Sequence, residues 1–473
     1  MFPTGGQTTP MTRIEHSPTD ELRFRLRGGL SEPGDPAYED ACTLFNAMVR
    51  KRPRLVAHCA APDDVAAALR YARDEGLEVA VRGGGHSVTG MSLAEGGLVI
   101  DARPMNEIAI DQERRTARVG GGATWAQFDR AAQPYGLATT GGRVSTTGVA
   151  GLTLGGGSGW LERKHGLACD NLLAVELVTA DGELVRASAD QHPDLFWALR
   201  GGGANFGVVT ALEFRMHPVG SELMAGLVLY HADRGREVLQ LFRDLMRHGP
   251  EELGLAFAYV TAPDEPDIPE ELRNQPSVLV AGLYVGPVEE GRAALRELRE
   301  FGPPVADFFE PMPYADFNCS IDDPPGYRNY WTAEHLADLS PAAIDAIAKR
   351  CEEQPAGPTQ LFIVPWGGEV ARVRHETSPL ADRDAGFIVH PLVLWEDPAD
   401  DERNMAWGRA FRRDLKPYAT GGAYLNFIGD EGRERLSAAF GPSEERLAQV
   451  KATWDPRNVF SGNQSLKPIV PAT

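Results

Sequence analysis

The sequence is poor in the features that mark a secreted, membrane-spanning or metal-binding protein. Its 473 residues include only five cysteines, an odd number with no Cys-x-x-Cys pair. This argues against a disulfide framework and a zinc site, and it suits a reducing compartment. No apolar run approaches the ~20 residues that a membrane span needs, and residues 1–20 lack a secretory pattern. We therefore expect a cytoplasmic protein with no metal and no membrane partner.

Positive charge is also scarce. The chain has 47 Lys and Arg against 67 Asp and Glu, which gives a formal net charge of −20, and no useful Lys/Arg-rich run. A nucleic-acid binder needs a basic face, so we do not expect nucleic acid as a partner. The acidity indicates a well-solvated surface. At this length two domains are expected, because domains typically run to ~100–200 residues.

Glycine, by contrast, is abundant and clustered. The chain contains 51 glycines, well above the average share of about 7%. The segments around them are apolar and strand-like, unlike the polar repeats of a flexible linker. Glycines between strands indicate a backbone that approaches something closely. The densest clusters are 83–85, 120–122, 141–142, 155–157 and 201–203.

The remaining patterns predict an α+β organisation. Apolar spacing predicts a helix over 62–76, and alternation predicts strands over 78–82, 98–100 and 208–215. Two hairpins are expected, one joining 108–110 to 116–119 and one joining 172–179 to 184–187. From about residue 220 a separate α+β unit is expected. Its predicted elements are strands at 223–231 and 277–285 and helices at 289–301 and 342–353, followed by a helix near 443–452.

The run Arg82-Gly83-Gly84-Gly85-His86-Ser87 follows a predicted strand directly. A glycine-rich turn at a strand end can offer several backbone N–H groups to one anion, so the run predicts a pyrophosphate cradle. The dinucleotide-binding alternative requires G-x-G-x-x-G at the start of a helix. None of the glycine clusters at 83–85, 155–157 and 201–203 fits that spacing.

Six strings together resemble the FAD-binding module of the vanillyl-alcohol oxidase and p-cresol methylhydroxylase (PCMH) type. Within that superfamily they are most similar to the berberine bridge enzyme-like group and bacterial relatives such as hydroxy-D-nicotine oxidase. The likeness covers most of 45–219 and 420–468. The strings are RGGGHSVTG at 82–90, Asp101, GGGATW at 120–125, GLTLGGGSGWLERKHGLACDNLL at 151–173, LFWALRGGGANFGVVT at 195–210 and WDPRNVFSGNQSLKP at 454–468.

The resemblance implies an α+β fold with a two-part FAD-binding domain and a separate α+β substrate domain. The FAD-binding domain is expected over 1–219, with its PCMH-type module at about 48–219. The substrate domain is expected over 220–420, and a C-terminal segment, 421–473, is expected to return to the FAD domain.

The resemblance also implies FAD as a covalently bound cofactor. His86 matches the histidine that forms an 8α-histidyl bond. A second, cysteinyl link is not expected, because Val144 stands at the matching position and Cys169 is interpreted as a small buried side chain. The other expected FAD contacts are Arg82, Gly83, Gly84, Gly85, Ser87 and Gly90 near the phosphates, Ser145, Thr147, Gly148, Gly151, Leu152, Gly155, Gly156 and Gly157 near the ring and diphosphate, Val209 near the adenine, and Asn426 and Asn463 from the C-terminal segment.

Two residues are candidates for the base that accepts a proton during substrate oxidation. Tyr424 begins a Tyr-x-Asn-Phe string where relatives have Tyr-x-Asn-Tyr, so Phe427 lacks a hydroxyl. A tyrosine near pKa 10 needs a lowered pKa or a hydrogen-bonding role. His390, on a predicted substrate-domain strand, titrates in a suitable range, although a structural role is equally compatible. Weaker substrate-lining candidates are Tyr327, Tyr330 and Trp331, which are equally compatible with ordinary core.

The implied activity is oxidation of a small organic molecule at a C–O or C–N centre. Hydride passes to flavin N5, and dioxygen is the expected electron acceptor, giving hydrogen peroxide. Thr147 is compact at a position that by resemblance borders the oxygen-facing side of the flavin, which favours an oxidase over a dehydrogenase. The alternatives are an oxidative cyclase or desaturase in natural-product biosynthesis and a flavin-binding protein without chemistry. The substrate domain carries no motif that identifies the substrate.

Overall fold

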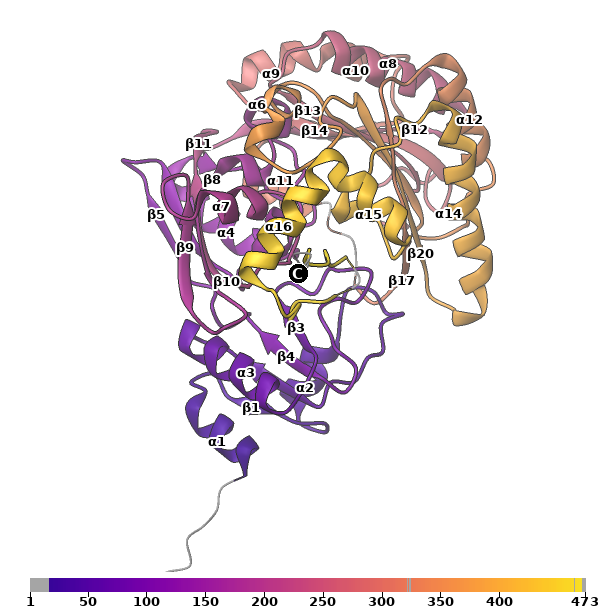
Figure 1. Ribbon diagram of the computed structural model, residues 1–473. Helices are drawn as coiled ribbons and strands as arrows, with labels where there is room; N and C mark the ends of the chain where they lie inside the picture. Colours follow the sequence, from indigo (N-terminus) through magenta and orange to yellow (C-terminus); the bar gives the residue numbers. More distant parts are fainter. Residues whose placement is uncertain (1–16, 321, 323–324, 463, 470–473) are drawn as a thin grey trace, which may run out of the picture.

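The computed structural model describes residues 17–320, 322, 325–462 and 464–469. In Figure 1 the N-terminal part lies at the bottom and left, the part after about residue 220 lies at the upper right, and the yellow C-terminal helices lie between them. Within the described residues, no helix combines the length and the apolar composition that a membrane crossing requires.

A four-stranded sheet forms the lower part of the molecule. In spatial order its strands are β1 (Leu30–Ser31), β2 (Leu55–His58), β4 (Leu98–Asp101) and β3 (Val79–Arg82). The last three are parallel, and helix α3 (Pro62–Asp74) packs on them through Val65, Leu69 and Ala72. The helix and strands predicted for this region are confirmed. Because β3 ends at Arg82, the glycine run begins at the carboxyl edge of parallel strands, where α/β sheets bind ligands.

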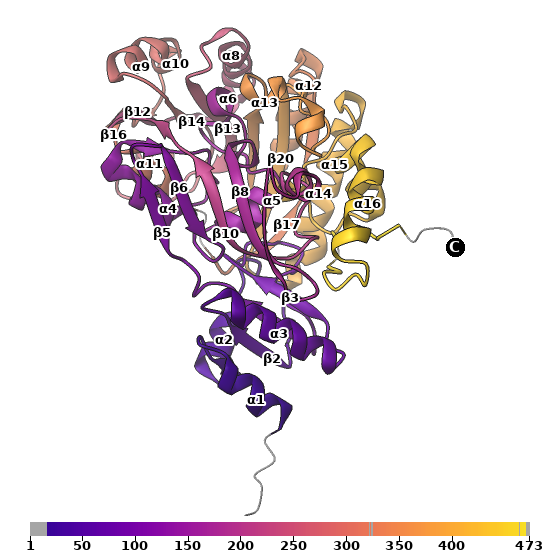
Figure 2. The same ribbon diagram turned by 60° about the vertical axis from the view of Figure 1, so that its left-hand side comes forward.

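A second, antiparallel sheet of five strands stands above the first (Figure 2). Its strands in order are β5 (Ile108–Asp111), β6 (Thr116–Gly120), β10 (Val208–Arg215), β8 (Leu172–Val178) and β9 (Leu184–Ser188). Both predicted hairpins, β5–β6 and β8–β9, are confirmed. The helices of this part are α4 (Trp125–Ala132), α5 (Val149–Leu154), α6 (Glu162–His165) and α7 (Pro193–Leu199).

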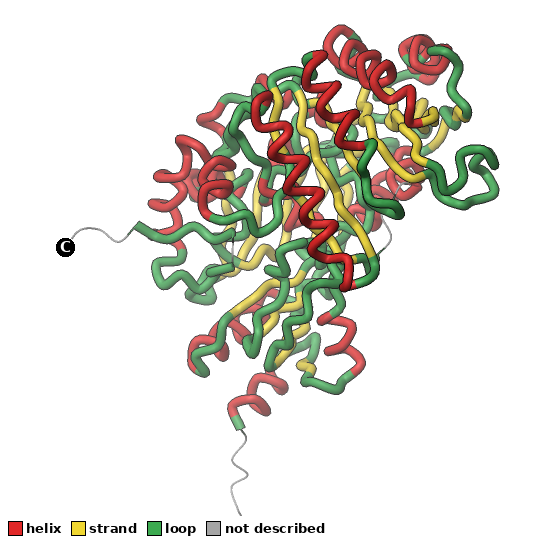
Figure 3. Tube along the Cα trace, turned by 90° about the vertical axis from the view of Figure 1, so that its right-hand side faces the viewer, coloured by secondary structure: helices red, strands yellow, loops and turns green. Residues whose placement is uncertain are grey.

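A nine-stranded sheet forms the upper part. Its main path is β15 (Ala306–Asp307), β12 (Leu223–His231), β14 (Pro276–Tyr284), β13 (Leu253–Thr261), β19 (Gln360–Pro365), β20 (Phe387–Trp395) and β17 (Arg328–Trp331), with β16 (Glu310–Met312) and β18 (Glu334–Leu336) beside it. Helices α8 (Gly235–His248), α12 (Pro341–Cys351) and α14 (Asp401–Leu415) cover one face, as Figure 3 shows. The helix expected over 289–301 is two shorter ones, α9 (Val288–Ala294) and α10 (Arg296–Glu300), which meet at Leu295.

The two faces of this sheet serve different purposes. Side chains alternate across a strand, so neighbouring residues face opposite sides. Val280 and Val389 pack against the covering helices, whereas Ala281 and His390, the next residue of each strand, face the opposite side and line a cavity. One face therefore forms the core, and the other is available for a ligand.

The C-terminal segment crosses back to the N-terminal part. Helix α15 (Arg433–Phe440) precedes α16 (Glu444–Trp454), which packs beside α7 in Figure 1. Buried Lys451 donates to the backbone oxygens of Asn205 and Phe460 and pairs with Asp455 at 2.6 Å. A buried ammonium requires such partners, and here they tie the last segment to the loop before β10.

Candidate active site

One cavity of about 670 Å³ lies where the three parts of the chain meet. This volume is typical of a small-molecule or cofactor site. Residues within 83–89, 142–160 and 203–209 form one side, the inward face of the nine-stranded sheet forms another, and residues within 425–428 and 460–464 complete the wall. The cavity therefore joins segments that lie far apart in the sequence.

Two glycine loops build the first side by direct backbone contact. A Cβ added to Gly84 would lie 2.2 Å from the backbone nitrogen of Gly148, and one added to Gly148 would lie 2.5 Å from that of Gly84. Real Cβ contacts are never that short, so both positions require glycine. The close approach sets the 83–87 loop against the start of α5.

The same loops leave room for a cofactor on the cavity side. Gly83 and Gly151 line the cavity, and a Cβ added to either would meet no protein atom closer than 3.8 Å. The missing side chains therefore leave open space where backbone groups can approach a ligand. A pyrophosphate-containing cofactor fits this cradle.

His86 lines the cavity next to these loops. Its ring stacks on Phe45, with the ring centroids 4.4 Å apart, and its Nε2 lies 3.0 Å from the Thr146 hydroxyl. Burial lowers the pKa of His86 to about 4, so the imidazole is neutral at pH 7. The ring is thus oriented and carries an unprotonated nitrogen.

Most of the residues expected to contact FAD do line the cavity. Asn426 approaches from the C-terminal segment and donates to the Leu152 backbone oxygen at 2.9 Å, and a Cβ added to Gly155 would strike its side chain. Val144, the position without a cysteine, also lines the cavity. The expected contacts found in the wall are Gly83, Gly84, Gly85, Ser87, Thr147, Gly148, Gly151, Leu152, Gly155, Val209 and Asn426.

Other expected contacts lie behind the wall. Arg82 is buried and donates to the Thr43 backbone oxygen at 2.9 Å, so it supports the glycine loop from beneath. Ser145 donates from its hydroxyl to Asp322 at 2.6 Å. Gly90, Gly156 and Gly157 are likewise not among the lining residues, and Asn463 lies outside the described residues.

The structure places Tyr424 beneath the cavity wall. Its buried hydroxyl accepts hydrogen bonds from the backbone N–H groups of Gly157 and Ser158, both at 2.8 Å, and from the Asn426 amide at 3.0 Å. Burial raises the pKa of Tyr424 above its ordinary value. The phenol is therefore held neutral, and its oxygen already serves three donors.

His390 is on the inward face of β20 and lines the cavity. Its Nδ1 donates to the Thr332 backbone oxygen at 2.8 Å, whereas its buried Nε2 has no hydrogen-bond partner among the described residues. Burial lowers the pKa of His390 to about 3. A neutral ring that donates from Nδ1 carries a lone pair on Nε2, so this nitrogen can accept a hydrogen bond or a proton.

Aromatic rings connect the two histidines across the cavity. Trp331 lies edge-on to both Phe45 and His390, and Phe427 stacks on His390 at 4.3 Å. Trp331 lines the cavity, as expected. Tyr330 instead packs towards α14 beside Gly408, and Tyr327 is half-buried outside the wall.

Several wall residues had not been identified from the sequence. They come from the inward face of the nine-stranded sheet, from the loop before α5 and from the loop before α6. Their only sequence signal is strand alternation, which does not tell which face meets a ligand. These residues are Leu227, Ala258, Leu279, Ala281, Phe362, Leu392, Arg143 and Trp160.

Comparison with known proteins connects this geometry to flavin enzymes. The family model described as FAD binding domain matches residues 53–188, and the model described as Berberine and berberine like matches residues 423–467. The two matches coincide with the segments that form the glycine side and the C-terminal side of the cavity.

Whole-chain relatives give the same result. The chain is 31% identical to (R)-6-hydroxynicotine oxidase of Paenarthrobacter nicotinovorans, with 94% of this chain and 97% of that protein covered. It is 30% identical to an FAD-linked oxidoreductase of Bacillus subtilis, with 94% and 98% covered. The structure of 6-hydroxy-D-nicotine oxidase from Arthrobacter nicotinovorans superposes with a TM-score of 0.83 at 30% identity, covering 92% of this chain and 96% of that one. Berberine bridge enzyme from Eschscholzia californica, at 20% identity, shares the fold with a TM-score of 0.85, covering 97% and 100%.

Proposed function

Because the chain belongs to the berberine bridge enzyme-like FAD-linked oxidoreductases, we propose that it is an oxidase of small, largely apolar molecules. It oxidises a C–O or C–N centre and releases hydrogen peroxide. The observation that carries this proposal is one cavity lined both by the glycine cradle with His86 and by His390, whose Nε2 has no hydrogen-bond partner among the described residues. FAD, when bound, accepts the hydride and passes the electrons to dioxygen.

His86 is proposed as the only covalent anchor of FAD. With FAD bound, the imidazole of His86 would supply the nitrogen for a bond to the 8α-methyl carbon, and dioxygen would take up the two electrons that this oxidation releases. The reaction requires an unprotonated nitrogen close to the cradle, and the lowered pKa of His86 supplies one at neutral pH. The stacked ring of Phe45 and the Thr146 hydroxyl hold the imidazole in place. Val144 cannot form a thioether, so one bond is expected.

His390 is proposed as the proton acceptor for the substrate. Its Nδ1 donates to Thr332, which leaves the lone pair on Nε2 of a ring in the cavity wall, and a substrate O–H or N–H is proposed to donate to this nitrogen. Tyr424 is the other candidate, but its hydroxyl already accepts three hydrogen bonds. We assign to Tyr424 the positioning of Asn426 and of the 157–158 backbone.

The lining of the substrate side favours an aromatic or otherwise apolar substrate. The sheet contributes Leu227, Ala258, Leu279, Phe362 and Leu392. Gln360 and His390 are the polar side chains of this face, so the wall offers few partners for the many hydroxyl groups of a sugar, whose burial without partners is costly. The similarity to a protein named for the oxidation of (R)-6-hydroxynicotine supports the same choice.

The test combines a cofactor measurement with a substrate screen. Acid-precipitated protein is expected to stay yellow, and colourless pellets from a yellow preparation would contradict the covalent bond. Aromatic secondary amines and benzylic alcohols are then supplied in air with peroxide detection, and anaerobically with the flavin absorbance followed. If a compound bleaches the flavin absorbance and air restores it with formation of peroxide, the oxidase is supported. Bleaching that does not recover identifies a dehydrogenase, and a flavin that no compound reduces identifies an inert binder.

A further inference from the structure

A second cavity, of about 410 Å³, lies between the FAD side and the substrate side of the molecule. Helix α6 and strand β11 (His217–Pro218) contribute from one side, and helix α13 (Glu369–Arg372) with the turn after it contributes from the other. The chain that lines the first cavity at Trp160 continues directly into α6, so the two cavities share one segment. The two cavities have no lining residue in common.

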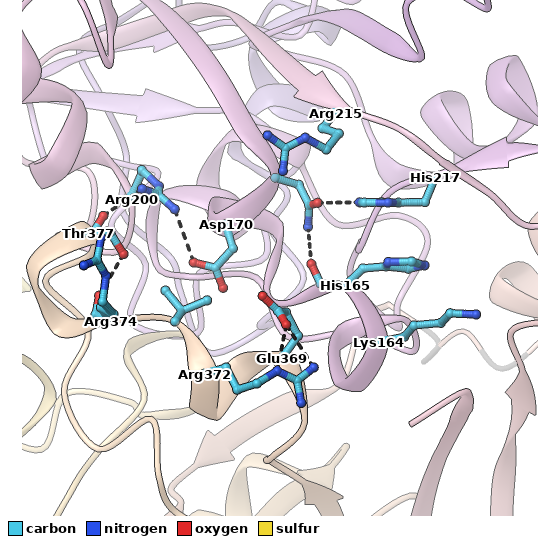
Figure 4. A pocket seen from close by; sticks show the side chains of 12 residues that line it. Lys164, His165, Asp170, Arg200, Arg215, His217, Glu369, Arg372, Arg374 and Thr377 are labelled. Atoms are coloured by element: carbon cyan, nitrogen blue, oxygen red, sulfur yellow. Dashed lines mark hydrogen bonds and ion pairs between the residues drawn. The ribbon is translucent and has the colours of Figure 1, made fainter. Parts of the chain in front are cut away.

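The lining of this cavity has the opposite charge to the protein as a whole. The formal net charge of the chain is −20, yet the cavity gathers Lys164, Arg200, Arg215, Arg372 and Arg374. Figure 4 shows Arg200 and Arg374 on one side, Lys164 and His217 on the other, and Arg215 above. Three of these cations have carboxylate partners, since Lys164 pairs with Glu252, Arg200 with Asp170, and Arg372 with Glu251 and Glu369.

The two carboxylates in the wall are already neutralised. Asp170 receives two hydrogen bonds from buried Arg383, at 2.8 and 2.9 Å, and Glu369 pairs with Arg372 at 2.9 Å. Arg215 and Arg374, by contrast, make no side-chain hydrogen bond or ion pair within the described residues. Two guanidinium groups therefore remain available for a ligand.

A histidine pair adds an independent observation. His165 and His217 stack with their centroids 3.8 Å apart, and Nε2 of His217 lies 2.6 Å from the Asn171 amide oxygen. The buried Nε2 of His165 has no partner among the described residues. The stacking and the hydrogen bond fix the orientation of both histidine rings in the cavity wall.

We propose that this cavity binds a small organic polyanion whose phosphate or carboxylate groups are held by Arg215 and Arg374. Guanidinium groups present paired donors that match both kinds of oxyanion. The volume lies in the range of small-molecule sites, ~300–1,000 Å³. The ligand bridges the end of β10 on the FAD side and the segment after α13 on the substrate side, so it links the two parts.

The test measures binding to the intact holoenzyme without turnover, so it is independent of the proposed oxidase activity. Inorganic pyrophosphate and citrate are titrated separately by calorimetry at an ionic strength held constant with sodium chloride. The variants are Arg215→Glu and Arg374→Glu. Arg413→Glu, an exposed residue of α14 outside the cavity, makes the same change of charge.

Saturable one-site binding of at least one probe to the wild type and to Arg413→Glu is expected. The affinity should fall roughly tenfold or more in each cavity variant, because each loses a charge-assisted contact. The probe that binds distinguishes a phosphate ligand from a carboxylate ligand. Absence of saturable binding, or equal affinity in all variants, would overturn the proposal. Because Arg215 and Arg374 are exposed, the variants should fold, which circular dichroism verifies.

Discussion

The two sides of the large cavity are built in different ways. On the cofactor side the backbone itself forms the surface, and Gly84 and Gly148 approach so closely that no side chain fits between them. On the substrate side alternate side chains of a sheet form the surface, and neighbouring strands contribute Phe362 and His390 side by side. The cofactor side is therefore intolerant of substitution, whereas the substrate side can change its specificity while the fold stays the same.

Removing His86, the proposed covalent anchor on the cofactor side, should have the largest effect, which is loss of the bound flavin on denaturation. In His86→Ala the covalent bond cannot form, so acid-precipitated protein should be colourless. The exposed His231→Ala is the matched control and should stay yellow. Flavin absorbance of the washed pellet is the measurement. A yellow His86→Ala pellet would assign the bond to another residue.

On the substrate side the largest effect is expected at His390. His390→Gln should keep the covalent flavin but slow its anaerobic reduction by substrate about 10²–10⁴-fold, the usual contribution of general-base catalysis. Stopped-flow reduction measures this, with the exposed His248→Gln as control. An unchanged rate in His390→Gln would remove His390 from the reaction and leave Tyr424 as the candidate.

The intolerance of the cofactor side can be tested with neighbouring glycines. Gly84→Ala places a Cβ 2.2 Å from a backbone nitrogen and should lower the free energy of unfolding by about 3 kcal/mol, the upper range for overpacking. Gly83→Ala meets no protein atom within 3.8 Å. It should keep the stability of the protein but reduce FAD incorporation, because its Cβ enters the cradle. If chemical denaturation gave Gly84→Ala and Gly83→Ala the same free energy of unfolding, the two glycine loops would be able to move apart.

Tyr424→Phe distinguishes a positioning residue from a base. The variant leaves three donors without their acceptor, so we expect the free energy of unfolding to fall by about 1–2 kcal/mol. The rate of flavin reduction should fall much less than in His390→Gln. A rate loss as large as that of His390→Gln with unchanged stability would reverse the two assignments.

The smallest effect is expected from pH. Because burial lowers the pKa of His390 to about 3, the ring is neutral and able to accept a proton throughout the neutral range. Its contribution to the rate of flavin reduction should therefore change less than about twofold between pH 5 and 8 and be lost only as the pH falls towards 3. An acid limb near pH 6.5 in the wild type that is absent from His390→Gln would contradict this.

Much of the cofactor side could be predicted from the sequence because glycine has one physical meaning there. Close backbone approach requires Gly84 and Gly148, a positive φ favours Gly85, and Gly83 and Gly151 leave open space in the cradle, so all five lie where the motif implied. The predicted hairpins and the helix at Pro62–Asp74 are confirmed because local alternation and the spacing of apolar residues determine them. The role of Arg82 could not be foreseen, since only packing turns its side chain beneath the loop instead of into the cavity.

The sequence by itself determined the family, the cofactor class and the histidine next to the cradle. Only the tertiary structure decided which face of the nine-stranded sheet meets the ligand, that Nε2 of His390 is left unpartnered, and that Tyr424 lies behind the wall. It also brought Arg215 and Arg374, far apart in the chain, to one cavity. The reason is physical: a motif encodes backbone shape over a few neighbouring residues, whereas a side chain's environment depends on distant segments that meet only in the folded protein.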